Sequence, residues 1–309
     1  MASPVLSSAL TSTWNRFRVW DLTAVELRVS LDQWRLWTLM LAVAGGILVT
    51  LGQQLSSLAA SIGPSAGPVG KVVSLGGAAA IALSAYFARE ALSNENVQRW
   101  TKCRSTAESL KATIYLYRAG VPPFDGTDRE EKLVDRRAAI EDAVEGVEPS
   151  VSQQEDKVVD LSPINVQDYV QQRVNDQIEF YRKRSGEYQK KTRALRQIVL
   201  WLGAVALLLG VVSAVEPLVA GWTAVIATVV AAISSHVQSQ RYQTLMAAYQ
   251  STARRLEMLR DKWEASGKSD MNRNAFIQSC EDTMSFENSA WITQWSQQKP
   301  PGQKPLGSD

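Results

Sequence analysis

Few side chains in this chain have the type and spacing needed for catalysis or metal binding. Its 309 residues include one histidine, His236, and two cysteines, Cys103 and Cys280. Neither cysteine has a second Cys or a His at ligand spacing, so we interpret both as apolar packing residues. The acidic pairs Glu130–Glu131 and Glu281–Asp282 lie in polar segments and are interpreted as solvated faces. With a single histidine in the chain, most Ser–His, Cys–His and metal-dependent chemistries lack their usual residues, so we predict no enzyme activity, no cofactor and no metal.

Four long apolar segments determine how the rest of the chain is arranged. They run Leu36–Leu51, Val72–Ala88, Ile198–Val215 and Pro217–Ser235, and none contains Asp, Glu, Lys or Arg. Crossing a hydrocarbon core takes roughly 17–25 helical residues, so the first two segments are near the short end. We predict an all-α membrane protein with two transmembrane helical hairpins, and the bilayer as its principal partner.

Basic residues flank these segments on one side only, which predicts the orientation. The flanking cations are Arg16, Arg18, Arg28, Arg35, Arg89, Arg99, Lys102, Arg104, Lys111, Arg182, Lys183, Arg184, Lys190, Lys191, Arg193, Arg196, Arg241, Arg254 and Arg255. Between the segments of each hairpin the only charges are Lys71 and Glu216. Loops rich in Lys and Arg stay inside, so both termini are predicted to be cytoplasmic and the protein to lie in the cell membrane. The balance of 33 basic and 31 acidic residues argues against a nucleic-acid partner.

The chain repeats one unit, in which a polar helix, a hairpin and a second polar helix follow one another. The predicted boundaries are 1–119 for the first unit, 120–163 for a linker, 164–296 for the second unit and 297–309 for a disordered tail. Within the linker, Arg129–Val144 is a candidate short helix. No Gly or Pro interrupts Ala78–Ala119 or Trp222–Ser266, so each second span is expected to continue as one helix beyond the lipid.

Apolar residues recur at alternating intervals of three and four in the polar segments. The series are Phe17, Trp20, Ala24, Leu27, Leu31 and Trp34; Trp100, Cys103, Ala107, Leu110, Ile114 and Tyr117; Tyr242, Leu245, Tyr249, Thr252, Leu256, Leu259 and Trp263; and, more weakly, Val170, Val174, Tyr181, Tyr188 and Leu195. This period favours coiled-coil-like packing against partner helices. We predict a cytoplasmic antiparallel helical bundle that continues both hairpins, and interpret the stripes as its core rather than as a ligand-binding face.

Small residues recur every four positions in the second and fourth segments. They are Gly76, Ala80, Ser84 and Ala88, and Ala220, Ala224, Thr228 and Ala232. Small side chains let helix backbones approach closely in lipid, so we interpret both stripes as helix-packing faces. Packing within one chain and packing between chains both remain open, and we expect a homo-oligomer.

Some polar residues in or near the apolar segments admit two interpretations. The hydroxyls of Thr38, Thr50, Ser74, Ser84, Ser213, Thr223, Thr228, Ser234 and Ser235 either line an aqueous path or bond to helix carbonyls, and we favour the latter. His236 is either a pH-sensitive gate or an interfacial residue, and Glu216 either lines an outer vestibule or is a polar turn residue. Because the segments contain no ionisable residue, a coupled transporter is disfavoured.

Three groups of polar and aromatic residues resemble motifs of the SLATT family. The first is Trp100, Arg104, Ala107, Glu108, Ser109 and Lys111, with Tyr117, Gly120, Pro122 and Phe124 after it; the second is Tyr169, Arg173, Val174, Gln177, Ile178 and Tyr181; the third is Cys280, Glu281, Glu287, Asn288 and Trp291. The chain is similar to the tandem form of these two-transmembrane effector domains, which are associated with nucleotide-sensing partners. The resemblance implies a membrane effector in bacterial defence that forms pores or perturbs the membrane when a sensor is triggered. No sensing domain is fused to this chain, so the expected sensor is a separate protein.

The motif residues also have a physical interpretation of their own. Arg104 and Glu108 are four apart on one helical face and could pair with each other, or with Arg173 and Glu281 across the bundle. We interpret them as structural ion pairs that fix helix register. The leading hypothesis is thus a pore-forming or membrane-perturbing effector gated by its bundle, and the alternative is a non-conducting scaffold that recruits a soluble partner through the bundle.

Overall fold

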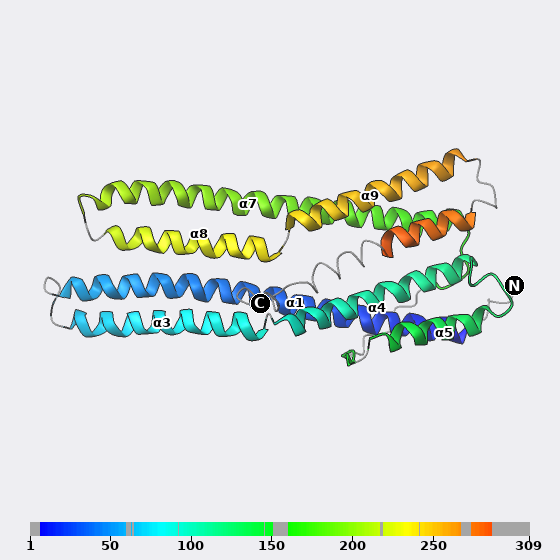
Figure 1. Ribbon diagram of the computed structural model, residues 1–309, viewed down its shortest axis with the longest axis horizontal. Coiled ribbons are helices and arrows are strands. Elements are labelled where there is room, and N and C mark those ends of the chain that lie inside the picture. Colours follow the sequence, from blue (N-terminus) through cyan, green and yellow to red (C-terminus); the bar gives the residue numbers. More distant parts are fainter. Residues whose placement is uncertain are drawn as a thin grey trace, which may run out of the picture. The chain divides into compact units, whose positions relative to one another are not determined.

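The computed structural model describes residues 7–59, 63, 65–91, 93–144, 146–150, 160–216, 219–240, 242–266 and 273–285. Within these residues the regular secondary structure is helical throughout (Figure 1). The helices are α1 (Ser8–Ser57), α3 (Ala66–Ala91), α4 (Asn94–Ala119), α5 (Arg129–Asp142), α6 (Val166–Tyr169), the π-helix η1 (Val170–Asn175), α7 (Asp176–Ser213), α8 (Ala220–Gln240) and α9 (Tyr242–Ala265). Residues 273–285 form a further helix. The described part of the chain is therefore all-α.

The helices divide into two compact units that do not coincide with the two sequence repeats. One unit, here called the polar unit, contains Met1–Val29, Asn94–Ser185 and Ala247–Asp309. The other, the apolar unit, contains Ser30–Ser93 and Gly186–Met246. Each repeat contributes to both units, because α1 and α7 are single helices that leave one unit and enter the other.

The core of the polar unit is built from the periodic apolar residues. In α1 these include Phe17, Trp20 and Ala24; in α4, Trp100, Cys103, Ala107, Leu110, Ile114 and Tyr117; in α9, Tyr249, Leu256 and Trp263, all of them buried. The short helix α5 packs beside α4 and is tied to α1, where the Trp20 indole donates a 2.9 Å hydrogen bond to the Glu141 carboxylate. Burial at helical spacing is what drives such segments together.

The prediction of one continuous helix over Ala78–Ala119 was wrong. α3 ends at Ala91 and α4 begins at Asn94, with Ser93 outside both helices. Ser93 directly precedes the first residue of α4, and serine is among the residues most favoured at a helix N-cap. The absence of Gly and Pro was therefore not enough to keep the helix unbroken. The corresponding join in the second repeat, at residue 241, lies outside the described residues.

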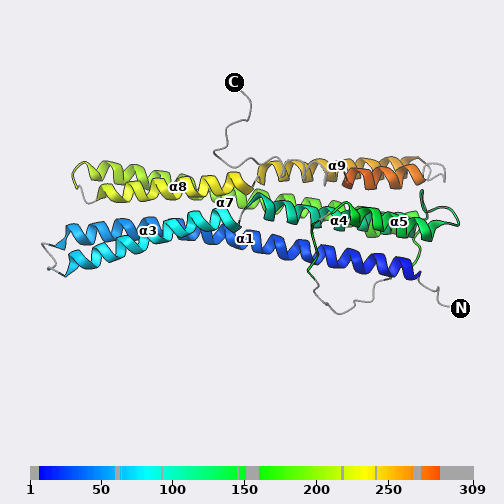
Figure 2. The same cartoon turned by 60° about the horizontal axis from the view of Figure 1, so that its bottom comes forward.

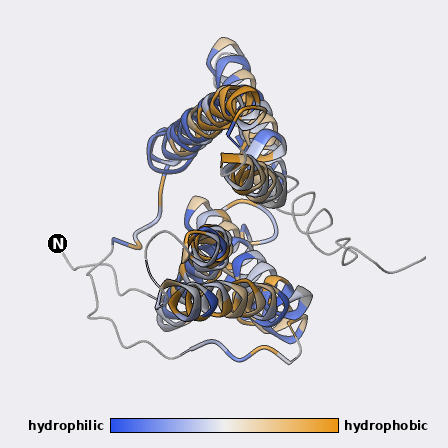
Figure 3. Cartoon of the chain, turned by 90° about the vertical axis from the view of Figure 1, so that its left-hand side faces the viewer, coloured by the Kyte–Doolittle hydropathy of each residue, from blue (hydrophilic) through white to orange (hydrophobic). Residues whose placement is uncertain are grey.

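The apolar unit contains the helices that are suited to a bilayer. α1, α3 and the helical run Val166–Ser213 are each long and apolar enough to cross a membrane, and Ala220–Ser234 of α8 is a shorter apolar helix. α3 lies along the second part of α1, and α8 lies along the second part of α7, in both views (Figures 1 and 2). Hydrophobic residues, coloured orange on the ribbon in Figure 3, are frequent in these helices. Many of their large side chains are exposed, among them Trp37, Leu75 and Trp201. Exposed aromatic and aliphatic surface of this kind is typical of lipid-facing helices.

Glycines bring α1 and α3 into close contact. A Cβ atom at Gly77 would lie 2.6 Å from the Val49 backbone nitrogen and 2.7 Å from the Gly45 carbonyl oxygen. A Cβ atom at Gly52 would lie 2.4 Å from the Gly70 carbonyl oxygen. No larger residue fits at either crossing, as expected where helix backbones touch in lipid.

The predicted small-residue stripes are placed differently in the two hairpins. In α3, Ser84 is buried and its hydroxyl donates a 2.7 Å hydrogen bond to the Thr38 carbonyl of α1, and Ala80 is half-buried. A Cβ atom at Gly76 would meet nothing within 4 Å, so the close approach is at Gly77, one residue later. In α8, Ala224 and Thr228 are exposed and Ala232 is half-buried.

Most of the hydroxyls in the apolar segments bond to helix carbonyls. Thr38, Thr50, Ser213 and Thr228 donate to carbonyls three or four residues earlier in their own helices. Ser74, like Ser84, instead donates across the hairpin, here to the Val49 carbonyl at 3.2 Å. These hydroxyls therefore stabilise helices and helix pairs. The side chains of Ser235 and His236 lie outside the described residues.

Candidate functional site

A π-helix positions the most unusual side chain of the polar unit. η1 spans Val170–Asn175 and is continuous with α6 before it and α7 after it. A π-helical turn contains an extra residue, so neighbouring positions can face the same side, and such turns are frequent at functional sites. Here Tyr169, Arg173 and Val174 are all buried, while Val170 is only half-buried. The turn thereby brings a charged residue into the core.

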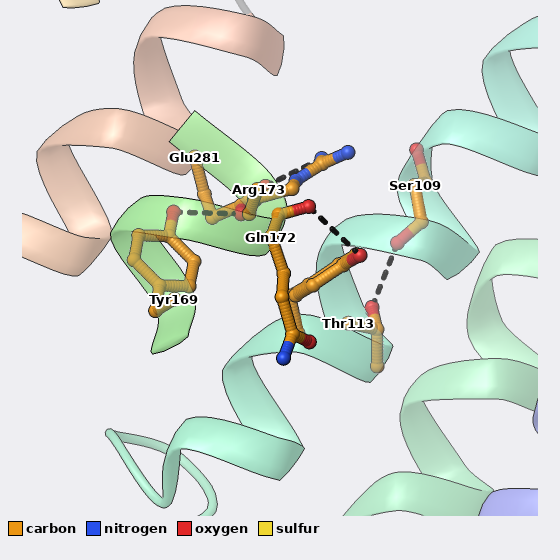
Figure 4. A network of polar contacts seen from close by, with 7 residues as sticks. Ser109, Thr113, Tyr169, Gln172, Arg173 and Glu281 are labelled. Atoms are coloured by element: carbon orange, nitrogen blue, oxygen red, sulfur yellow. Dashed lines mark hydrogen bonds and ion pairs between the residues drawn. The ribbon is translucent and has the colours of Figure 1, made fainter. Parts of the chain in front are cut away.

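Tyr169, Arg173 and Glu281 form a hydrogen-bonded cluster, here called the buried triad (Figure 4). The Arg173 guanidinium donates from Nε to Glu281 Oε1 at 3.0 Å and from Nη2 to Oε2 at 2.9 Å. The Tyr169 hydroxyl donates to Oε1 at 2.8 Å. Arg173 is 2 % exposed and Glu281 3 % exposed, so the interpretation of Glu281 as part of a solvated face was wrong. The planar guanidinium of arginine matches the two oxygens of a carboxylate, and lysine could not form this bidentate pair.

Aromatic rings surround the buried triad. The Arg173 guanidinium carbon lies 4.9 Å from the centre of the Tyr115 ring, close enough for a cation–π contact. The Tyr115 hydroxyl in turn donates to the Gln172 carbonyl at 3.4 Å, which fastens α4 to η1 (Figure 4). On the other side, Phe276 meets the Tyr169 ring edge-on at 6.4 Å and stacks on Trp263 at 5.2 Å. The rings keep water from the ion pair, which strengthens its electrostatics.

The hydrogen bonds from Arg173 to Glu281 use the Nε and Nη2 atoms but not Nη1. Its Nη1 atom is buried and has no hydrogen-bond partner among the residues that the structure describes. A buried donor without an acceptor costs about 1–3 kcal/mol. The buried triad is therefore well bonded on the Glu281 side and under-satisfied at Nη1.

The charge states of the buried triad follow from its surroundings. Burial acts against the charged guanidinium, but the Glu281 carboxylate outweighs it and raises the pKa of Arg173 above its usual value. Burial and the same carboxylate raise the pKa of the Tyr169 hydroxyl well above its usual value. Tyr169 therefore stays protonated and remains a donor, and Arg173 stays charged.

A second charged group lies on α4 beside the buried triad. Arg104 and Glu108 form a 3.2 Å ion pair at i,i+4 spacing. Burial acts to raise the pKa of Glu108, but Arg104, Lys111 and Arg173 together lower it. Burial and the charge of Arg173 lower the pKa of Lys111. On α1, burial and the Glu108 carboxylate raise the pKa of Asp21.

Both thiols are buried and unreactive in character. Cys103 and Cys280 are each 0 % exposed. Burial raises the pKa of the Cys103 thiol, and burial together with the neighbouring Glu281 carboxylate raises that of Cys280. In the part of the chain that the structure describes, no three His, Cys, Asp or Glu residues gather as a metal site. The arrangement of the cluster is thus that of a structural ion pair.

The structure brings some of the predicted motif residues together and not others. Tyr169, Arg173 and Glu281 meet directly, and Arg104 pairs with Glu108 within α4. The remaining described motif residues contribute packing: Trp100 is buried beneath the Arg28 guanidinium, Lys111 lies 6.0 Å above the Phe17 ring, Gln177 is half-buried in α7, and Tyr181 contacts the rings of Phe180 and Tyr249. Glu287 and Trp291 lie outside the described residues.

Three residues of the site were not singled out from the sequence. Tyr115 lies seven residues after Glu108 and four after Lys111, so helical spacing places it on their face of α4. That spacing was the available signal. Asp21 and Phe276 carry no such local signal, because their partners belong to other helices.

Comparison with known proteins identifies the two repeats separately. The family described as SMODS and SLOG-associating 2TM effector domain 1 (SLATT_1) matches residues 169–291. A family described only as a protein of unknown function (DUF4231) matches residues 18–132. No curated protein and no solved structure matches the chain significantly. The first match contains the α7–α8 hairpin with Tyr169, Arg173 and Glu281, and the second contains the α1–α3 hairpin with the α4 motif. The chain therefore carries a two-transmembrane effector domain of the SLATT family at residues 169–291.

Proposed function

We propose that the protein is a multi-pass membrane effector that permeabilises the bilayer when its cytoplasmic helices rearrange. In this proposal the apolar unit crosses the membrane four times, as two hairpins, and the polar unit forms a bundle on the cytoplasmic side with both termini. No catalytic step is assigned to it. One observation carries the proposal: α1 and α7 each run without a break from the charged polar unit into an apolar segment.

Helix continuity supplies the mechanical link. α7 has 38 residues, which at 1.5 Å per residue is about 57 Å of helix. A helix of this kind moves as a rigid element, so rotation or translation of its cytoplasmic end reaches the apolar end. The buried triad holds that cytoplasmic end, because η1 leads directly into α7 and its Arg173 is fixed by Glu281 of the helix at 273–285.

The conducting state is proposed to be an oligomer with an apolar constriction. The apolar segments carry no ionisable side chain, so charge-based selectivity has no residue to act through. Most of their hydroxyls are already bonded to carbonyls. Several copies would therefore have to separate their apolar helices to admit water. The trigger is proposed to be a separate sensor protein that acts on the bundle, as in bacterial defence systems of the family.

Leakage from vesicles tests the proposal. The full-length protein is reconstituted into vesicles loaded with a self-quenching dye, and the wild type is compared with Glu281→Gln, which removes the charge that holds Arg173. We expect faster leakage from the variant. The matched control is Arg254→Gln on α9, whose side chain is exposed.

Two results would contradict the gating mechanism. The first is equal leakage from Glu281→Gln and Arg254→Gln vesicles. The second is the absence of leakage from every sample despite complete insertion, which would favour the non-conducting scaffold. In that case the polar unit acts only as a platform for a soluble partner, and capture of that partner should survive changes in the apolar helices.

A further inference from the structure

A groove is bordered partly by η1, the π-helix that carries Arg173 of the buried triad. It has a volume of about 500 Å³ and is bordered by α6, η1, the end of α9 and the start of the helix at 273–285. Pockets of roughly 300–1,000 Å³ are of the size that holds small organic ligands. The groove lies entirely within the polar unit.

Side-chain amides form one wall of the groove. Gln167, Gln171 and Asn175 all line it and follow one another at intervals of four residues. Asn175 Nδ2 donates to Gln171 Oε1 at 3.3 Å, and Asn175 Oδ1 accepts from Arg260 Nη1 at 3.0 Å. The amides of Gln171 and Asn175 are thereby oriented, and their remaining donors and acceptors can bond to a ligand.

Two guanidinium groups give the groove a positive charge. Arg260 and Arg273 both line it, and Glu264 is the one carboxylate among its described lining residues. Arg260 also donates from Nη2 to the exposed Asp261 carboxylate at 3.4 Å, so Arg273 contributes most of the positive charge that is not already paired. Arg273 uses Nη2 to donate to the Ala119 carbonyl at the end of α4, which orients its side chain and leaves Nε and Nη1 for another acceptor. Guanidinium groups bind carboxylate and phosphate oxygens in a bidentate manner.

The indole of Trp263 completes the lining. Its ring is largely buried and stacks on Phe276, which itself contacts Tyr169 of the buried triad. The groove therefore combines a positive rim, a row of amides and an aromatic surface. These are the components of a site for an organic anion rather than for a cation or a hydrocarbon chain.

We propose that this groove binds a small organic anion through a phosphate or carboxylate group, and that binding changes how tightly η1 holds Arg173. Gln171 and Asn175 belong to the same six-residue π-helix as Arg173. A ligand that forms hydrogen bonds with these two amides acts on η1, which sets the direction of the Arg173 side chain. The coupling rests on the proposed gating, whereas the binding does not.

Calorimetric titration of the full-length protein in micelles tests the binding. Inorganic pyrophosphate serves as the phosphate probe and citrate as the carboxylate probe, so the two arms distinguish the ligand classes. We expect one probe to bind, with an affinity at least tenfold lower in Arg260→Gln and in Arg273→Gln. Arg254→Gln, the same charge change at an exposed position of α9, should bind as the wild type does.

A variant that leaves the buried contacts intact guards against misfolding. Gln171 is exposed, so Gln171→Leu removes a groove amide without disturbing the core, and it should also weaken binding. The proposal is overturned if neither probe binds to the wild type, or if Arg254→Gln loses as much affinity as the groove variants. Unchanged affinity in all three groove variants would overturn it equally, since the probe would then bind elsewhere.

Labelling of Cys280 tests the coupling independently of any leakage. Cys280 is fully buried beside Glu281, so its reaction with a maleimide requires the helix at 273–285 to open. In a Cys103→Ala background, we expect the saturating probe to change the labelling rate at least threefold. An unchanged rate in a protein that binds the probe would overturn the coupling.

Discussion

Removing either partner of the buried ion pair should destabilise the polar unit far more than removing both. In Glu281→Met, the Arg173 guanidinium loses both of its acceptors and the Tyr169 hydroxyl loses its own. In Arg173→Met, the Glu281 carboxylate still accepts from Tyr169. Breaking a buried pair by deleting one partner costs about 3–5 kcal/mol. We therefore expect Glu281→Met at the upper end of this range and Arg173→Met at the lower end.

The double variant Arg173→Met/Glu281→Met removes both charges and leaves apolar side chains of similar length. Its remaining defect is the Tyr169 hydroxyl, which is buried and has lost its acceptor. An unsatisfied buried hydroxyl costs about 1–3 kcal/mol. The double variant should accordingly be less destabilised than Glu281→Met. Adding Tyr169→Phe to the double variant should restore most of the stability that it still lacks relative to the wild type.

Labelling of Cys280 measures these differences locally. The thiol is 0 % exposed, so its reaction rate reports the population in which the surrounding helix is open. Since about 1.4 kcal/mol corresponds to a factor of ten, the single variants should react roughly two to four orders of magnitude faster than the wild type. The control is Arg182→Met, which breaks an ion pair with Glu257 whose arginine side chain is 68 % exposed and should change little.

The double-mutant cycle also has an outcome that contradicts the reasoning. If the rates show that the two single effects add in the double variant, then Arg173 and Glu281 do not stabilise each other. The energetic importance of the buried triad would then lie in packing alone. The same conclusion would follow if Arg182→Met accelerated labelling as much as Arg173→Met.

Four further predictions concern the α1–α3 hairpin, the carboxylates of Glu108 on α4 and Asp21 on α1, and the Cys280 thiol. Gly77→Ala should lower the thermal midpoint in micelles and Gly76→Ala should not, because only the first new Cβ would meet the facing backbone, at 2.6 Å. Glu108→Gln should lower the thermal midpoint at pH 7. The pKa of Glu108 in the folded protein is below its usual 4.5, so the ionised carboxylate stabilises the fold at pH values above 4.5. The difference in midpoint between the variant and the wild type should become smaller as the pH falls below 4.5. Asp21→Asn should raise the midpoint at pH 7, because the folded pKa of Asp21 is above its usual 3.8 and ionisation there opposes folding; equal midpoints for the variant and the wild type would contradict this. Cys280 in the native protein should resist maleimide at neutral pH and react on denaturation; rapid native labelling would show that its helix is open.

The amphipathic helices of the polar unit were predictable because burial follows the helical period. Trp100, Leu110 and Ile114 recur at that period in the sequence, and all three are buried in α4. The partner of Arg173 was less accessible. Glu281 is 108 residues away, so local spacing could offer it only as one option among several.

Register inside the apolar unit could not be predicted for a different reason. A helix that is apolar on every side has no polar face to mark which residues turn toward a partner. Gly76 and Gly77 are adjacent and equally small, and only the contact with Gly45 and Val49 distinguishes them. The π-helix poses a similar problem, because its extra residue interrupts the regular helical period, and the adjacent residues Arg173 and Val174 are both buried in it.

A buried ion pair is an inefficient way to stabilise a helix bundle, and this bears on its role. Well-packed apolar residues often replace such a pair with no loss of stability, whereas an unpaired charge in the same place is strongly destabilising. Under the proposed gating, the buried triad would have two distinct states: a closed one, in which Glu281 holds Arg173, and an open one, in which the unpaired charge requires water. A pair of methionines has no such second state.

This difference lets the vesicle assay distinguish two roles of the buried triad, a switch and a static structural contact. If the unpaired charge of Arg173 opens the bundle, Glu281→Gln should leak, while Arg173→Met/Glu281→Met should remain as tight as the wild type, because neither methionine needs water. The two proteins should show the same circular dichroism and the same degree of insertion. If the double variant leaks as fast as Glu281→Gln, then the loss of the specific contacts, and not the unpaired charge, loosens α7. The buried triad would then be a static structural contact that holds η1 in place.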